Sequence, residues 1–206
     1  MSDLFDDNND NNEVNSKEEK GVYKEVAVGE KLLQWRDYTP FVFFALLLLV
    51  NKPTVLSAVL GTLLLLVGLV IRVYSSSFVK ENGDWQDLVT EGPFSYIRYP
   101  LDMGTIIIII GAAVFSASII FLALAIVAFA LQYHFIAKYE EYVLASKLGD
   151  VYKEYKDNVP AWIPRKKFCF SEMIPPKYLP EALRREKKVF IVVAVALVLL
   201  VALARK

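Results

Sequence analysis

The sequence predicts an all-α, polytopic membrane protein with about five transmembrane helices. Its composition is 55% hydrophobic and its mean hydropathy is +0.39, which is too apolar for an ordinary soluble domain. Long apolar runs alternate with short polar segments, and the basic residues gather in only some of those segments. Because backbone polar groups must be paired inside hydrocarbon, we expect the apolar runs to be helices.

Five apolar runs are the candidate crossings. They are Pro40 to Val50, Thr54 to Ile71, Leu101 to Phe115, Ser118 to Phe135 and Val189 to Ala204. A full crossing takes about 20 apolar residues, so the second and fourth runs are long enough and the other three are short. For the last run, a buried or interfacial tail is the alternative to a crossing.

Two connections between these runs are too short to hold a domain. Asn51-Lys52-Pro53 joins the first two runs, and Ser116-Ala117-Ser118 joins the third and fourth. We therefore expect each connection to be the tip of a helical hairpin. The prediction is two hairpins followed by one terminal helix.

The distribution of basic residues predicts the orientation in the membrane. With five crossings, 20 of the 23 Lys and Arg residues lie on the same side as the amino terminus, and only Lys52, Arg205 and Lys206 lie opposite. Basic segments are retained in the cytoplasm, so the polar motifs are expected to face it. The bacterial inner membrane and the endoplasmic reticulum are both compatible with this arrangement.

The remaining composition limits the domain organisation and the partners. Residues 1–20 are rich in Asp, Asn and Glu and predict a disordered tail, which leaves 21–206 as a single membrane domain. The net charge of zero gives no indication of nucleic acid binding. A single cysteine, Cys169, excludes an internal disulfide and, together with the single histidine, disfavours a metal site.

Polar chemistry lies directly before the third run. Gly92-Pro93 is a turn signal, and Pro100 suits the first position of a helix, where its missing N–H is not needed. Arg98 can reach lipid phosphates or pair with a carboxylate. Asp102 is favoured by the dipole of the first helical turn, and a helical turn from Arg98 onward would allow the two side chains to pair. A salt-bridged cap and a role in ligand binding are both open for Asp102.

A second polar segment follows the fourth run. Glu140-Glu141 lie near a predicted helix end, where the helix dipole disfavours carboxylates unless they have partners. His134 lies two turns before Glu141 on the same helical face, as an interfacial residue or a proton shuttle. Gly149 predicts the end of that helix.

The segment after Gly149 predicts a short amphipathic helix and then an extended chain. Tyr152 and Tyr155 share one face of this helix. Val159-Pro160 and Ile163-Pro164 hold the chain extended. Trp162 between them can close a pocket over the hairpin ends or act as an interfacial anchor.

Taken together, residues Leu88 to Pro164 resemble the isoprenylcysteine carboxyl methyltransferase and phospholipid methyltransferase family of membrane enzymes. The resemblance rests on an ordered series of motifs: Gly92-Pro93-Phe94, Arg98 to Gly104, Glu140-Glu141, Gly149 to Tyr155, and Val159 to Pro164. The ordered series is much more specific than any single motif.

This resemblance implies methyl transfer from S-adenosyl-L-methionine to a lipophilic substrate, of a prenylated or phospholipid type, that enters from the bilayer. The cofactor would lie at the cytoplasmic ends of the hairpin. The catalytic residues implied are Arg98 and Glu141, and the cofactor-binding residues are Tyr96, Tyr99, Pro100, Asp102, Gly104, His134, Glu140 and Glu141. No metal is implied.

Two positions depart from the family pattern. Tyr99 stands where the family has histidine, and Asp102 stands where it has tyrosine. Two other functions are therefore considered: an NADPH-dependent sterol or steroid reductase of the membrane, which has a similar helix entry, and a non-catalytic membrane relative of the methyltransferases. The Glu140-Glu141 pair favours methyl transfer over reduction.

Overall fold

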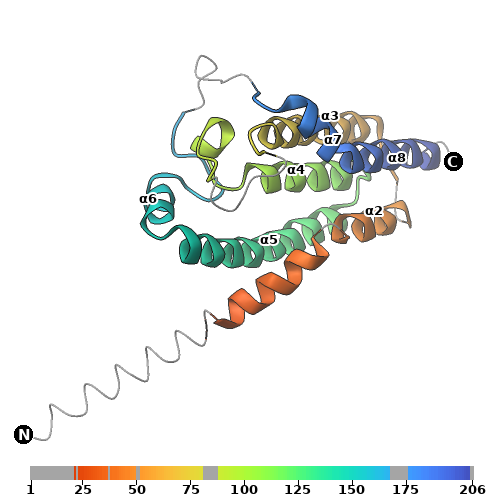
Figure 1. Cartoon of the computed structure of the whole chain (residues 1–206). Helices are drawn as coiled ribbons and strands as arrows, with labels where there is room; N and C mark the ends of the chain where they lie inside the picture. Colours follow the sequence, from red (N-terminus) through yellow and green to blue (C-terminus); the bar gives the residue numbers. More distant parts are fainter. Residues whose placement is uncertain are drawn as a thin grey trace, which may run out of the picture.

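A computed structural model describes residues 21, 23–36, 38–49, 52–80, 88–167 and 176–204. All the elements in these ranges are helices (Figure 1), so the all-α prediction is confirmed. A helical segment at 23–35 is followed by α2 (Thr39–Leu49), α3 (Val55–Ser76), the 3-10 helix η1 (Gly92–Ser95), α4 (Pro100–Phe115), α5 (Ile119–Leu148), α6 (Asp150–Asn158), α7 (Leu179–Arg185) and α8 (Lys187–Ala204). The predicted tail at 1–20, Asn51 and Cys169 lie outside the described residues.

Two of the described helices are long and apolar enough to cross a membrane, namely α3 with 22 residues and α5 with 30 residues. At about 1.5 Å per residue, α3 is about 33 Å long, which matches a hydrocarbon core of about 30 Å. Much of its outer surface is exposed and apolar, for example at Val55, Leu56 and Val70. The helix α4 is equally apolar but shorter.

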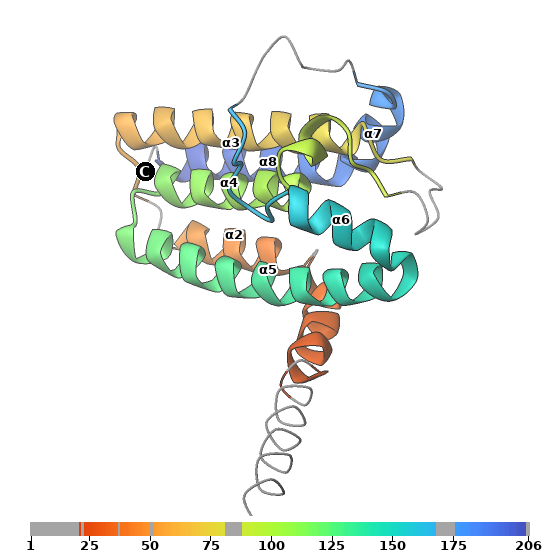
Figure 2. The same ribbon diagram turned by 90° about the vertical axis from the view of Figure 1, so that its left-hand side faces the viewer.

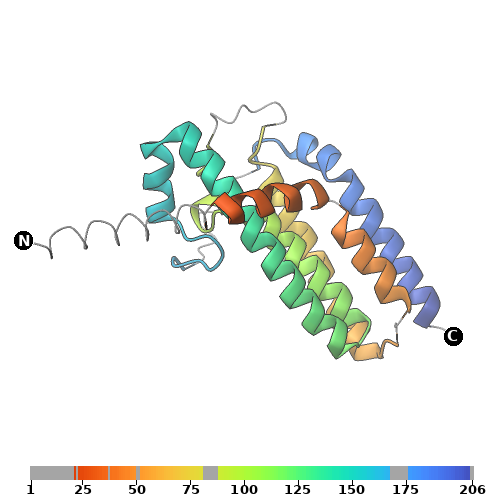
Figure 3. The ribbon, with the colours of Figure 1, turned by 90° about the horizontal axis from the view of Figure 1, so that it is seen from below.

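The helices α2, α3, α4, α5 and α8 lie side by side in one bundle (Figures 1 and 3). The turn at 116–118 and the carboxyl end of α8 lie at one end of the bundle. The short helices α6 and α7 and the segment before α4 lie at the other end (Figure 2). Motif residues far apart in the sequence therefore meet at a single polar end.

The most extensive contact among the described helices is between α3 and α4, where glycines let the two backbones touch. Gly68 faces Gly104, and a Cβ added to Gly68 would lie 2.7 Å from the carbonyl oxygen of Gly104. One heptad away on each helix, Gly61 and Gly111 make a similar contact. Small residues at such an interface are typical of helix packing in membranes, where close van der Waals contact drives association.

Local sequence signals set the helix boundaries where predicted. Pro100 is the first residue of α4. Ala117, with a φ of 56°, lies in the turn between α4 and α5. Gly149 has a φ of 54° and separates α5 from α6. Because this left-handed conformation strains residues with a Cβ, glycine is the residue suited to that junction.

The two helices of the first predicted hairpin pack mainly against other helices. The chain reverses direction between α2 and α3 (Figure 3), but α2 packs against α8 and α4, and α3 packs against α4. Hydrophobic runs alone predict only that neighbouring helices are antiparallel. The glycine rows on α3 and α4 decide which pair packs closely.

Replacing Gly68 by alanine tests this interface. We expect Gly68→Ala to destabilise the protein by about 1–3 kcal/mol, because its methyl group must push apart two backbones rather than a flexible side chain. The matched control is Gly21→Ala, where an added Cβ meets nothing within 4 Å. Thermal unfolding in detergent should show a lower midpoint for Gly68→Ala only, and equal midpoints would contradict the role of the glycine contact.

Candidate functional site

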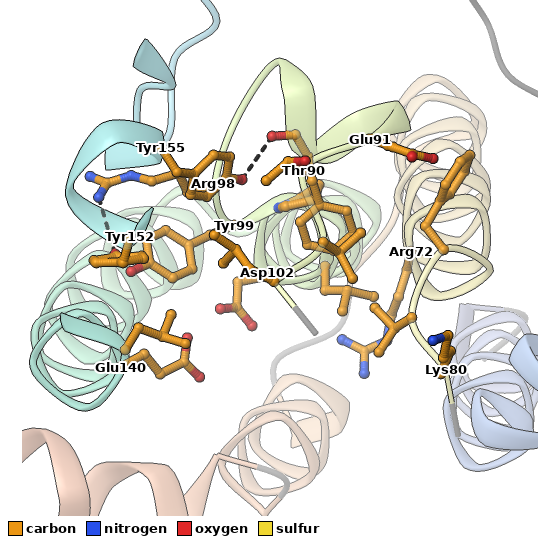
Figure 4. Close-up of a pocket in the computed structure, with 18 of the residues that line it drawn as sticks. Arg72, Lys80, Thr90, Glu91, Arg98, Tyr99, Asp102, Glu140, Tyr152 and Tyr155 are labelled. Atoms are coloured by element: carbon orange, nitrogen blue, oxygen red, sulfur yellow. Dashed lines mark hydrogen bonds between the residues drawn. The ribbon is translucent and has the colours of Figure 1, made fainter. Parts of the chain in front are cut away.

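A cavity of about 640 Å³ opens at the polar end of the bundle (Figure 4). Its wall is formed by the carboxyl end of α3, the segment 88–94, the start of α4, the second half of α5, helix α6 and the segment before α7. The charged and aromatic side chains among its lining residues are Arg36, Arg72, Phe78, Lys80, Glu91, Phe94, Arg98, Tyr99, Asp102, Glu140, Tyr152, Tyr155, Lys177 and Tyr178.

The residues just before α4 are fixed by backbone hydrogen bonds to the segment that follows α6. The N–H of Arg98 donates to the carbonyl of Pro160 at 2.9 Å, and the N–H of Tyr99 donates to that of Ala161 at 3.4 Å. The ring of Trp162 lies against the ring of Tyr99, with centroids 5.2 Å apart. Trp162 therefore packs against the start of α4, and it is not one of the residues that line the cavity.

Tyr99 lies buried in the cavity wall. Its hydroxyl donates to the carbonyl of Ala137 on α5 at 3.2 Å. Burial raises the pKa of Tyr99 above its ordinary value, and the nearby Tyr152 and Glu141 raise it further. Tyr99 is therefore a neutral hydrogen-bond donor that connects the start of α4 to α5.

Arg98 is held by groups on α5 and α6. It forms an ion pair with Glu141 at 2.9 Å, and the two side chains are 9% and 15% exposed. It also donates to the hydroxyl of Tyr152 at 3.2 Å. The predicted pair with Asp102 is not formed, because α4 begins only at Pro100 and Arg98 is not part of its first turn. The buried Nε of Arg98 has no hydrogen-bond partner among the described residues.

Glu140 and Asp102 lie together on another part of the wall (Figure 4). Both carboxylates face one nitrogen of Arg36, which is 3.3 Å from Glu140 and 3.8 Å from Asp102. The adjacent Glu141 points instead to Arg98 and to Lys156, which is 2.8 Å away. The two neighbouring glutamates thus have different partners and different positions.

Arg72, at the end of α3, lies on the opposite part of the wall. Its guanidinium donates to the carboxylate of Glu186 and to the hydroxyl of Thr105. Glu186 is buried at the junction between α7 and α8. This ion pair ties α3, α4 and α8 together beside the cavity.

The short helix α6 presents the two tyrosines of its predicted apolar face inward. Tyr152 and Tyr155 are both buried. The Tyr155 hydroxyl donates to the carbonyl of Phe94 at 2.8 Å, and burial raises its pKa. The amphipathic prediction for this segment is confirmed, and α6 forms a lateral wall of the cavity.

The structure brings most of the sequence-predicted site residues together. Arg98, Tyr99, Pro100, Asp102 and Glu140 line the cavity, and Glu141 contacts it through Arg98. Glu141 itself does not line the cavity, and three other predicted residues do not line it either.

Those three residues are Tyr96, Gly104 and His134. Tyr96 is half-buried next to η1, and Gly104 lies in the contact between α3 and α4. His134 is exposed on α5, with its ring beside that of Phe135. Helical spacing predicted that His134 lies on the same face as Glu141. In the bundle, however, the side chain of His134 is exposed and lies away from the cavity.

Sequence reasoning missed several charged residues of this site. Arg36 precedes the first apolar run, Arg72 ends the second, and Glu186 lies in a basic segment. Each was counted only as a flanking charge. The sequence offered one signal for these residues, which was the acidic Glu186 among basic neighbours.

Among the described residues, no group of three or more His, Cys, Asp or Glu side chains is arranged to hold a metal ion.

These features define a class of protein: a helical membrane protein with a charged, aromatic cavity at one end of its bundle. Residues 56–151 match the family described as phospholipid methyltransferase. The family resemblance seen in the motifs is therefore confirmed for the region from α3 to the start of α6. The matched region includes α3, where the sequence motifs had not yet begun.

Two curated relatives are similar over shorter stretches. The nickel-cobalt-cadmium resistance protein NccN of Alcaligenes xylosoxydans xylosoxydans is 33% identical over 86 residues, which are 42% of this chain and 40% of the relative. The cobalt-zinc-cadmium resistance protein CzcN of Cupriavidus metallidurans is 36% identical over 78 residues, 38% of this chain and 36% of the relative. The matched stretch is thus less than half of either relative. No solved structure matches.

The two partners of Glu141 allow a direct test of the ion pair with Arg98. We expect Glu141→Gln to destabilise the protein by about 2–4 kcal/mol, because it leaves the buried guanidinium of Arg98 without its counter-charge. Lys156→Gln removes the other ion pair of Glu141, but Lys156 is 47% exposed, so its loss should cost less than about 1 kcal/mol. Thermal unfolding should show a lower midpoint for Glu141→Gln than for Lys156→Gln. Equal midpoints would contradict the importance of the buried ion pair.

Proposed function

We propose that this chain is an integral membrane, S-adenosylmethionine-dependent methyltransferase that acts on a lipophilic substrate. The proposal rests on one observation: the segment that matches the methyltransferase family also lines the cavity. This segment supplies Arg98, Tyr99, Asp102 and Glu140 to it. The volume of that cavity falls in the range of about 300–1,000 Å³ that is typical of small-molecule sites.

The lining residues fit S-adenosylmethionine, which when bound supplies a methyl group on a positively charged sulfur. The carboxylate of Glu140 favours a cation at its part of the wall. Tyr99 and Tyr155 offer aromatic faces to a cation. The buried Nε of Arg98 is a hydrogen-bond donor that an acceptor atom of the cofactor can satisfy.

The contribution of the chain itself would be positioning. Arg98 is fixed by Glu141 and Tyr152, so its positive charge is held at a defined position. Trp162 packs against Tyr99 and would help to hold it in place. Holding two reactants in a fixed orientation accounts for a large part of many enzymatic rate enhancements.

The proposed substrate is a membrane lipid or a prenylated molecule that enters from the bilayer. The cavity lies at the end of helices whose outer surfaces are apolar and exposed, such as those of α3 and α5. A substrate with its tail between lipids would reach the cavity with its polar group. The family match supports this substrate class.

We further propose five crossings, with the cavity on the cytoplasmic side. The polar end of the bundle contains the basic segments that the sequence predicted to be cytoplasmic. The turn at 116–118 and the end of α8 lie together at the opposite end (Figure 1).

Cysteine labelling tests this topology. In a Cys169→Ser background, we expect Lys166→Cys to react with a membrane-impermeant reagent from the cytoplasmic side. Lys52→Cys and Lys206→Cys should react only from the opposite side, because they follow the first and fifth crossings. Labelling of positions 166 and 206 from the same side would contradict the fifth crossing.

Ligand binding tests the proposed cofactor. We expect isothermal calorimetry of the purified protein to show binding of S-adenosylhomocysteine. Glu140→Gln should weaken binding of S-adenosylmethionine about tenfold, because this ligand carries a positively charged sulfur and one carboxylate of the cavity loses its charge. The control is Glu154→Gln, the same change on the exposed side of α6.

NADPH serves as the competing ligand in the same experiment. Binding of NADPH with no binding of S-adenosylhomocysteine at millimolar concentration would contradict methyl transfer and support a reductase. Absence of binding by both would support a non-catalytic relative.

A further inference from the structure

The structure points to a role for Arg36, which lies outside the segment that matches the methyltransferase family. Arg36 directly follows the helical segment 23–35, and its side chain lines the cavity. One of its nitrogens lies 3.3 Å from an oxygen of Glu140 and 3.8 Å from an oxygen of Asp102. A segment far from the motifs in sequence therefore contributes the cation between two carboxylates of the site.

The surroundings of the two carboxylates give them little contact with water. Asp102 is only 7% exposed. Among the described residues, Arg72 also lies close enough to affect Asp102, but its guanidinium binds Glu186 and Thr105. In a place with little water, two like charges repel strongly unless a cation separates them.

The backbone of Arg36 is fixed in place by helix packing. The hydroxyl of Thr39 donates to the carbonyl of Arg36 at 3.3 Å and accepts a hydrogen bond from the buried Gln132 of α5 at 2.9 Å. The helix 23–35 also approaches α5 closely at Gly29, where an added Cβ would lie 2.2 Å from the carbonyl oxygen of Phe135. Arg36 is thus held at a constant position relative to Glu140.

We propose that Arg36 is a positioning residue for the cofactor site. It holds the carboxylate of Glu140 toward the cavity and offsets the negative charge of Asp102 beside it. This inference rests on the proposed function, because the ligand is the cofactor of methyl transfer. It assigns Asp102 the role of a partner of Arg36 rather than a separate ligand contact.

Calorimetry with S-adenosylhomocysteine tests the proposal on the full-length protein. We expect Arg36→Gln to weaken binding about tenfold, because Glu140 loses its partner and faces Asp102. Arg36→Lys keeps the charge and should stay within about threefold of the unmodified protein. The control Lys31→Gln removes the same charge from an exposed position of the same helix and should leave binding unchanged.

The double variant Arg36→Gln with Asp102→Asn separates positioning from a structural role. Removing the second carboxylate ends the repulsion, so we expect binding within about threefold of the unmodified protein. A purely structural role of Arg36 would not be rescued in this way. If Arg36→Gln alone does not fold, the double variant provides the test. Binding by the double variant that is at least tenfold weaker than that of the unmodified protein overturns the proposal.

The outcomes also separate this inference from the proposed function. If the unmodified protein binds S-adenosylhomocysteine and Arg36→Gln binds it equally well, only the role of Arg36 is overturned. If the unmodified protein does not bind it, the proposed function fails and this inference fails with it.

Discussion

Backbone contact between α3 and α4 is the constraint on which the rest of the structure depends. Gly68 and Gly104 let these helices touch, which brings the carboxyl end of α3 next to the first turn of α4. Arg72 thereby reaches Thr105 and Glu186, and the start of α4 becomes a wall of the cavity. A larger residue at this contact would separate the two ends that form the site. The family match begins on α3, in agreement with its place in this unit.

Paired charges determine the character of the cavity. Three arginines reach it from separate elements, and each is held by a carboxylate: Arg36 by Glu140, Arg72 by Glu186 and Arg98 by Glu141. Each pair crosses between elements distant in the sequence, so assembly of the bundle assembles the charges. Fixed charges of this kind are suited to bind a zwitterionic or charged ligand without large rearrangement. The same pairs keep the buried ions compensated in a region of low dielectric constant.

The ordered motifs act as one structural unit. Arg98 and Tyr99 at the start of α4 form backbone hydrogen bonds with Pro160 and Ala161, and Trp162 packs against Tyr99. The phenol of Tyr99 bonds to α5, so it connects two helices where the family has an imidazole. The unit lies where the apolar bundle ends, a place that a lipophilic substrate and a water-soluble cofactor can both reach.

The sequence by itself determined the elements. Lengths of apolar runs indicated the long helices, Pro100 and Gly149 fixed boundaries, and periodicity placed Tyr152 and Tyr155 on one face, because these properties depend on backbone bonding and side-chain spacing within a few residues. Only the tertiary structure decided the partners. It paired Arg98 with Glu141 rather than Asp102, brought Arg36 to Glu140, and turned His134 outward. These outcomes depend on which helices pack and at what rotation, and local sequence does not specify that.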